Sequence, residues 1–448
     1  TGLLDSADSL GGTISANGTI VGWTHNFAWQ SVFNGTDLRY ERTTARQLSG
    51  SGRLAALPDS ASGTVAVRLD TVRTGGVSLA RFEAAAELRG GSRATATAAV
   101  EMSRGTRMRG RAEIFRHGDS TDMRLDSLAL KTNANLWSLQ RTGIIALTPG
   151  AVRLDTLSLI TANGGRITVG GQSSADSVLA LLVQADRVPL VDIGEVMQAE
   201  STLDGTLSFR ADVRGTHTRP DLFFSGMIKD AMFGGVRIES LQADGRYAER
   251  RLTTTMEYSR LGIPAFHAEA TLPIDLALNP AGPRLLEEPL AGRIRTDSVG
   301  LVLFESFSKA VSGASGALDV NVDLAGTWKH PRMTGALRVL DGAFILAPIG
   351  DVKLSGLDAD IRFLGDSIDV QRLTVHSGIS HTATATLSGF IGIRDIENPT
   401  FGLSLDTRGF NVIKRPLIAD LDLTGELSLT GAWRSATLAG NLEVNRGV

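Results

Sequence analysis

The side chains that most often carry out chemistry are sparse in this sequence of 448 residues, and their spacing supports no metal site. His376 and His381 are the closest pair of histidines. Five residues apart on a strand, they would point to opposite faces, so they could not share one metal ion. Asp119, Asp122 and Asp126 offer carboxylates to calcium, but they lack the glycine position and the spacing of an EF-hand loop. We therefore predict no metal and no cofactor.

The run 118–120, Gly-Asp-Ser, is similar to the turn that presents the nucleophile in some esterases. That turn needs a strand before it, a helix after it and a histidine placed as base, and the sequence supplies none of these in context. The pair of glycines at 50 and 52 precedes a strand rather than a helix, so it does not fit a dinucleotide-binding loop. The sequence therefore predicts no catalytic residue, and the chain is not expected to be an enzyme.

Bulk composition narrows the class of protein further. The net charge of −3 and the absence of arginine clusters give no electrostatic footprint for nucleic acid. The sequence has no cysteine, which excludes disulfides and thiolate chemistry. With 50 glycines against 13 prolines, many tight turns are expected. No apolar run approaches the roughly 20 residues of a membrane-spanning helix, and Thr1 is not an initiator, so we expect a processed or excised segment.

The elements that must position any functional side chain are strands. Residues 316–324 alternate apolar and polar types without a break, and residues 63–70 do the same. A period of two places every apolar side chain on one face of a strand. Helical patterns are rare: Asp192 and Glu195 have the spacing of a capping box, and residues 298–311 form a second short amphipathic pattern. The sequence predicts a mostly β protein with a few short helices.

Three segments of the chain repeat the same order of features. Gly205 and Gly316 are 111 residues apart, as are Pro220 and Pro331, and a shorter copy follows 105 residues later around Trp433. A period this long means that each repeat contains several strands. We predict an N-terminal segment at 1–185, repeats with a short helix at 186–296 and 297–405, and the start of a further repeat at 406–448.

Strands with one apolar face, joined by short turns, form an antiparallel sheet with one dry side. Few aromatic residues and no long helices are available to cover that side, so we expect a long curved antiparallel sheet that forms an elongated groove. Aliphatic side chains lining such a groove suit acyl chains, because each methylene withdrawn from water contributes about 0.8 kcal/mol. The predicted lipid-binding residues of the groove lining are Leu318, Val320, Val322, Leu324, Leu403, Leu405, Leu427 and Leu429.

Several runs together resemble the TamB family of Gram-negative envelopes, within the wider AsmA-like group. The shared pattern is a Gly-x-Leu strand, a Gly-Thr turn, a proline and a Leu/Met-x-Gly-x-Leu strand, and it occurs at 203–222 and at 316–335. The segments 125–171 and 186–190 also resemble the family. The resemblance covers nearly the whole chain and is weakest over 1–60 and 245–290.

The resemblance implies a repeating β-groove, or β-taco, that conducts phospholipid across the periplasm and supports outer-membrane protein assembly. It implies an inner-membrane anchor, membranes at both ends of the full-length protein and an outer-membrane barrel partner of the Omp85 type. No N-terminal anchor is recognisable here, and the family's C-terminal region also looks absent, so we expect an internal segment.

Two other classes of protein fit the alternating strands. One is a structural or adhesive β-solenoid surface protein whose apolar face is filled by its own side chains; a solenoid would repeat every 20–30 residues or so. The other is a β-solenoid enzyme that processes polysaccharides, which would need carboxylates clustered on an exposed sheet face. The lipid-conducting segment is the function we predict.

Overall fold

The computed structural model describes most of the chain, which forms two compact units, residues 1–217 and 218–448. The residues described are 10–40, 43–74, 77–174, 179–199, 204–233, 236–260, 263–278, 280, 282–296, 299–301, 311–346, 352–377, 382–395, 397–415 and 419–447.

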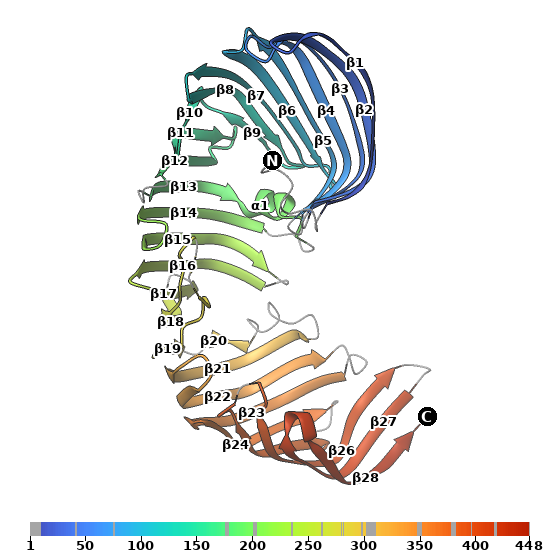
Figure 1. Ribbon diagram of the computed structural model, residues 1–448. Coiled ribbons are helices and arrows are strands. Elements are labelled where there is room, and N and C mark those ends of the chain that lie inside the picture. Colours follow the sequence, from blue (N-terminus) through green and yellow to red (C-terminus); the bar gives the residue numbers. More distant parts are fainter. Residues whose placement is uncertain are drawn as a thin grey trace. The chain divides into compact units, whose positions relative to one another are not determined.

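The first unit consists of antiparallel strands and one short helix (Figure 1). Its elements are β1 (Leu10–Trp23), β2 (Asn26–Tyr40), β3 (Thr43–Leu57), β4 (Ser62–Thr74), β5 (Val77–Arg89), β6 (Arg93–Met102), β7 (Arg107–His117), β8 (Ser120–Lys131), β9 (Leu136–Leu139), β10 (Gly143–Thr148), β11 (Ala151–Ile160), β12 (Arg166–Ser174), β13 (Leu179–Pro189), α1 (Leu190–Val196) and β14 (Asp204–Gly215).

The second unit continues with strands and a single turn of 3₁₀ helix among its described residues. Its elements are β15 (Pro220–Phe233), β16 (Val236–Ala248), β17 (Arg251–Arg260), β18 (Ile263–Pro273), β19 (Ala291–Thr296), β20 (Val299–Gly300), β21 (Val311–Gly326), β22 (Pro331–Leu346), β23 (Val352–Gly365), β24 (Ser367–Ser377), β25 (Thr384–Gly392), β26 (Thr400–Arg415), β27 (Ala419–Ala432), η4 (Trp433–Ser435) and β28 (Thr437–Gly447).

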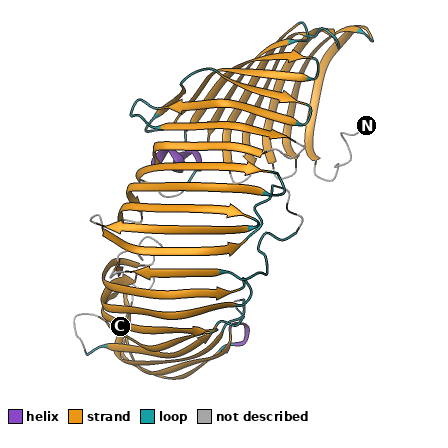
Figure 2. Ribbon diagram, turned by 90° about the vertical axis from the view of Figure 1, so that its left-hand side faces the viewer, coloured by secondary structure: helices purple, strands orange, loops and turns teal. Residues whose placement is uncertain are grey.

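Within each unit the strands pair mostly with their neighbours in sequence, and all of these pairs are antiparallel (Figure 2). The exceptions involve the short strands β9, β10, β19 and β20. Both β9 and β10 pair with β8 and with β11, and both β19 and β20 pair with β21. The predicted fold class, a mostly β protein built on a large curved antiparallel sheet, is confirmed. In the first unit the sheet curves around α1, which lies against its inner side (Figure 1).

The repeat seen in the sequence has a backbone counterpart. Gly205 and Gly316 have φ of 103° and 112°, and Gly215 and Gly326 have φ of 99° and 94°. A Cβ at Gly326 would collide with the carbonyl oxygen of His330, so only glycine fits this turn. Each turn leads to a strand that begins with proline, β15 in one copy and β22 in the other. The boundaries of the four predicted segments stay predictions.

One of the two expected helices is present. α1 spans Leu190–Val196, so it begins two residues before Asp192, and its N-cap position is Pro189, with no side-chain cap. The capping box predicted at Asp192 is therefore wrong; the side chain of Asp192 is buried and bonded elsewhere. Most of the second expected helix, 302–310, lies outside the described residues. Among the residues described, no helix is long and apolar enough to cross a membrane.

Candidate functional site

The eight predicted lining residues occupy three strands of the second unit. Leu318, Val320, Val322 and Leu324 lie on β21, Leu403 and Leu405 on β26, and Leu427 and Leu429 on β27. Directly paired residues of antiparallel strands point to the same face of a sheet. The strand pairing from β21 to β27 therefore decides whether the four residues on β21 share a face with the four on β26 and β27.

Register places both groups on one face. Starting at Val320, successive partners across β22 to β27 are Leu337, Ile361, Val370, Gly389, Leu403 and Leu429. Starting at Leu318, they are Val339, Ala359, Leu373, Leu387, Leu405 and Leu427. No polar residue interrupts either row. This side of the second unit, together with Val322 and Leu324, is called its apolar face below.

Part of that face is closed by its own side chains. Leu318 is 7% exposed and packs in a cluster with Leu301, Val339 and Ala359, and Val322 is 8% exposed. The other six predicted residues are half-buried. A second cluster includes Phe410, and Leu405 packs against it. The apolar face is therefore core near Leu318 and more open toward β27.

The opposite face of the second unit carries charge. Asp323 on β21 forms ion pairs with Arg293 and Arg295 on β19, at N–O distances of 2.8 and 3.3 Å. The hydrogen bond from Arg293 is the main reason that the pKa of Asp323 lies below its ordinary value. On β23, Asp360 Oδ1 lies 3.9 Å from Arg362 Nε. Charged pairs on one side and aliphatic rows on the other give the sheet two chemically distinct faces.

The first unit has a hollow that the sequence prediction did not single out. Val67, Ala84, Ala98, Gly110 and Leu128 are successive partners across β4 to β8. The neighbouring row is Val65, Ala86, Ala96, Ala112 and Leu125. These two rows line an open hollow of about 440 Å³.

The hollow exists because its lining is small. Alanine and glycine leave space above β5, β6 and β7 that leucine or valine would fill. The signal in the sequence was alanine at alternate positions, 84 and 86, then 96 and 98. We call this side the apolar face of the first unit. Met108 lies on that face and pairs with Leu130, which pairs in turn with Trp137. Helix α1 packs on the same side, because its Ile193 packs against the cluster that contains Trp137.

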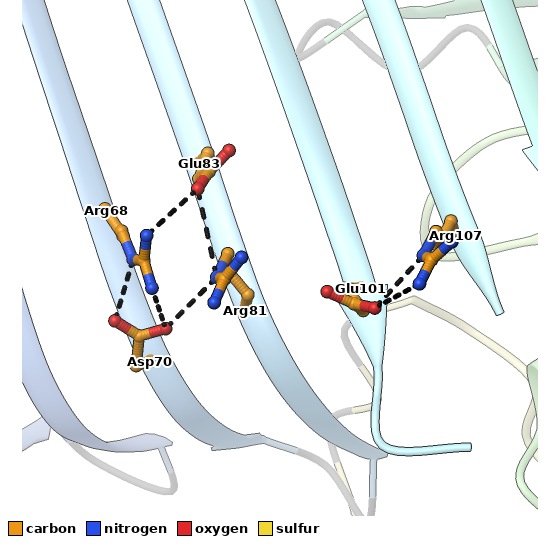
Figure 3. A network of polar contacts seen from close by, with 6 residues as sticks. All are labelled: Arg68, Asp70, Arg81, Glu83, Glu101 and Arg107. Carbon is orange, nitrogen blue, oxygen red and sulfur yellow. Dashed lines mark hydrogen bonds and ion pairs between the residues drawn. The ribbon is translucent and has the colours of Figure 1, made fainter. Parts of the chain in front are cut away.

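The polar face of the first unit holds a network of ion pairs (Figure 3). The carboxylate oxygens of Asp70 lie 2.9 Å from Arg68 Nε and 3.3 Å from Arg81 Nε, and Glu83 Oε1 lies 3.6 Å from Arg68 Nη1. The hydrogen bond from Arg68 lowers the pKa of Asp70 below its ordinary value, and the same bond raises the pKa of Arg68. Arg107 and Glu101 form a further pair at 2.9 Å. Since these pairs are partly exposed, each contributes little to stability.

The residues weighed for chemistry are dispersed. In the run 118–120, Gly118 and Asp119 form the turn between β7 and β8, and Ser120 begins β8; Asp126 is paired with Arg124 at 2.9 Å. His376 lies on β24, and His381 is outside the described residues. In the part of the chain that the structure describes, no group of three or more His, Asp or Glu side chains is placed to hold a metal ion.

The two tryptophans that follow equivalent glycine turns differ. Trp328 donates a hydrogen bond from Nε1 to the carbonyl oxygen of Pro273 at 3.0 Å, which anchors the turn after β21. Trp433 is 67% exposed and meets the ring of Phe401 edge to face, with centroids 6.1 Å apart. The first is a structural anchor at a strand end, whereas the second is largely open to solvent.

Comparison with known proteins gives one match. Residues 369–448 match the family model described as TamB C-terminal domain. No curated protein and no solved structure matches the chain. The match corrects the expectation that the family's C-terminal region is absent: β24 to β28 repeat the alternating strands found upstream, so pattern alone did not distinguish this domain from a further repeat. The predicted resemblance to the TamB family is confirmed by this match, which covers residues 369–448.

Proposed function

We propose that this chain is a lipid-conducting segment, in which acyl chains lie on the apolar faces of its sheets and headgroups stay in water. TamB is a family of cell-envelope proteins and is not a family of enzymes. The observation that carries the proposal is the unbroken apolar row across β21 to β27, backed by a face of ion pairs. Such a sheet can hold hydrocarbon on one side and meet water on the other.

The hollow of the first unit has the right size for hydrocarbon. Its volume of about 440 Å³ equals that of roughly 15 water molecules at about 30 Å³ each. A methylene group is of similar size, so the hollow holds about one acyl chain. Each methylene withdrawn from water contributes about 0.8 kcal/mol. Because the hollow is open on one side, an acyl chain bound there stays partly in water and gains only part of this free energy. Such moderate binding suits a lipid that must move on along the protein.

The remaining parts of the proposal depend on the resemblance to TamB. They are phospholipid as the cargo, transport between inner and outer membranes across the periplasm, support of outer-membrane protein assembly, and a barrel partner of the Omp85 type. The inner-membrane anchor of the full-length protein belongs with them. The apolar residues proposed to line the path are the eight named on β21, β26 and β27, together with the alanine rows of β5 to β7.

A structural protein with a self-filled face is the second candidate, and one observation favours it. Leu318 and Val322 are buried by the chain's own side chains. The two candidates differ in what the purified chain carries. Mass spectrometry of an organic extract should find phospholipid in near-stoichiometric amount if acyl chains occupy the apolar faces. An extract free of phospholipid, from protein that was purified without detergent and is folded, would favour the self-filled sheet.

A further inference from the structure

The segment Leu190–Ala199 connects two distant parts of the first unit's sheet. It leaves β13 as helix α1, and its last residues reach the beginning of β5. Following strand pairing, β5 and β13 are separated by β6, β7, β8, β10, β11 and β12. At about 4.8 Å for each step, a flat sheet would hold them about 34 Å apart.

The connecting segment is much shorter than that path. A helix of 7 residues rises about 10 Å, and the turn residues Met197 and Gln198 after it add at most about 7 Å. The segment therefore takes the direct path across the open side of a curved sheet, whereas the strand pairing follows the longer path along the curve. This geometry makes residues 190–199 a strap across the apolar face of the first unit, where α1 is drawn inside the curve (Figure 1).

One end of the strap is held by a buried carboxylate. Asp192 is 3% exposed and accepts hydrogen bonds from Thr132 Oγ1 at 2.5 Å, Asn135 Nδ2 at 2.9 Å and Trp137 Nε1 at 2.9 Å. Glu195 accepts a further bond from the backbone N–H of Asn133 at 2.8 Å. Three side-chain donors converge on this carboxyl group where water is excluded, and hydrogen bonds are stronger in such low-dielectric surroundings. This end is fixed.

The other end is held more weakly. The side-chain amide of Gln198 donates to the carbonyl oxygen of Ser78 at 2.6 Å and accepts from its backbone N–H at 3.1 Å. Arg104 donates to the carbonyl oxygen of Ala199. Gln198 has a φ of 56°, a left-handed conformation that residues other than glycine adopt only when their surroundings hold them there. Releasing this neutral contact would relieve that strain.

We propose that residues 190–199 form a gate over the apolar face of the first unit, with Asp192 as its fixed anchor and the Gln198–Ser78 contact as its releasable latch. The inference rests on the proposed lipid function. When latched, the strap closes the curve between β5 and β13 and retains an acyl chain. When the latch opens, the strap swings on α1 and the chain can enter or leave sideways. Met197, 71% exposed beside the latch, is positioned to meet the arriving lipid.

The absence of cysteine allows a clean test. In the full chain, Ser78→Cys and Gln198→Cys are introduced together and joined with a short bis-methanethiosulfonate linker, which dithiothreitol removes. The matched control carries Ser51→Cys and Ala66→Cys, paired on adjacent strands of the polar face, joined by the same linker. Loading is measured from vesicles of phosphatidylethanolamine and phosphatidylglycerol that contain a trace of phospholipid with a fluorescent acyl chain.

The linked latch should slow both uptake and release at least tenfold, and reduction should restore both rates, while the linked control keeps the unlinked rate. Gln198→Ala should instead accelerate release several-fold. If the linked Ser78→Cys, Gln198→Cys variant takes up and releases phospholipid as fast as the same variant after reduction, the gate is refuted although the lipid function stands. If the wild-type chain takes up no phospholipid at all, the lipid function is refuted and the gate with it.

Discussion

Replacing Ala98 with aspartate puts a charge into the hollow of the first unit without disturbing a packed core. Ala98 lies on β6 between Ala84 and Gly110, and it is exposed. Its neighbour Thr97 is also exposed, and its side chain points to the polar face, where it is paired with Ala85 and Arg111. Thr97→Asp is therefore a matched control, with the same new charge on the same strand and on the other side of the sheet.

The size of the effect follows from the cost of a carboxylate in hydrocarbon. Aspartate at the centre of a membrane-spanning helix costs about 2.5–3.5 kcal/mol on the insertion scale. Since about 1.4 kcal/mol is a factor of ten in affinity, Ala98→Asp should weaken the binding of an acyl chain in the hollow by about 60- to 300-fold. Thr97→Asp should change it by less than about twofold, because the new carboxylate stays in water.

The assay is titration of each variant with a phospholipid that carries a fluorescent acyl chain, together with thermal unfolding of the empty protein. Both variants should unfold within a few degrees of the wild type, since neither position is buried. Equal affinities for Ala98→Asp and Thr97→Asp would refute the assignment of the hollow to acyl chains. A loss with Thr97→Asp alone would move the site to the polar face.

Three further outcomes are expected. Trp137→Phe removes one donor from buried Asp192 and should lower the stability of the chain by about 1–3 kcal/mol in denaturant titration, whereas Trp433→Phe, at an exposed site, should change it by less than about 0.5 kcal/mol. Gly326→Ala should cost at least about 1 kcal/mol by the same measurement, because φ is 94° and the new Cβ would meet backbone. The lowered pKa of Asp70 stabilises the fold above the unfolded-state pKa of about 3.9. As the pH falls from 5 through that value and on through the lower folded pKa, the contribution is lost, so the stability difference between the wild type and Asp70→Asn should vanish at low pH.

Much of the fold could be predicted because its determinants are local. Alternation over 316–324 decides which side chains share a face, and the structure keeps that face from Val320 to Leu429 although bulges shift the register beside Ile361 and Val370. The glycine turns at Gly316 and Gly326 could also be predicted, because a positive φ favours glycine and so leaves a visible mark in the sequence. Period-two patterns and obligatory glycines are properties of short stretches, so they survive without knowledge of distant contacts.

What could not be predicted depends on curvature. Whether an apolar residue becomes core or lining is decided by which distant strands lie above it, and the sequence does not give that distance. Leu318 packs into a core cluster, whereas Ala98, a less hydrophobic residue, faces open space. Choosing the most hydrophobic residues as groove lining therefore selects the part of the sheet that is filled by its own side chains. The spacing of Asp192 and Glu195 predicts a helix cap, but the partners of Asp192 lie at 132–137, about 60 residues away in sequence.

Photoaffinity labelling tests the central claim, that acyl chains lie on the apolar faces, most directly. The purified chain is loaded with a phospholipid that carries a photoreactive group in its acyl chain, irradiated, digested and mapped by mass spectrometry. Adducts should fall on apolar-face positions such as Ala98, Leu403 and Leu427 and spare their polar-face neighbours Thr97 and Ser404. Adducts spread equally over both faces, or found only on the polar face, would contradict the account.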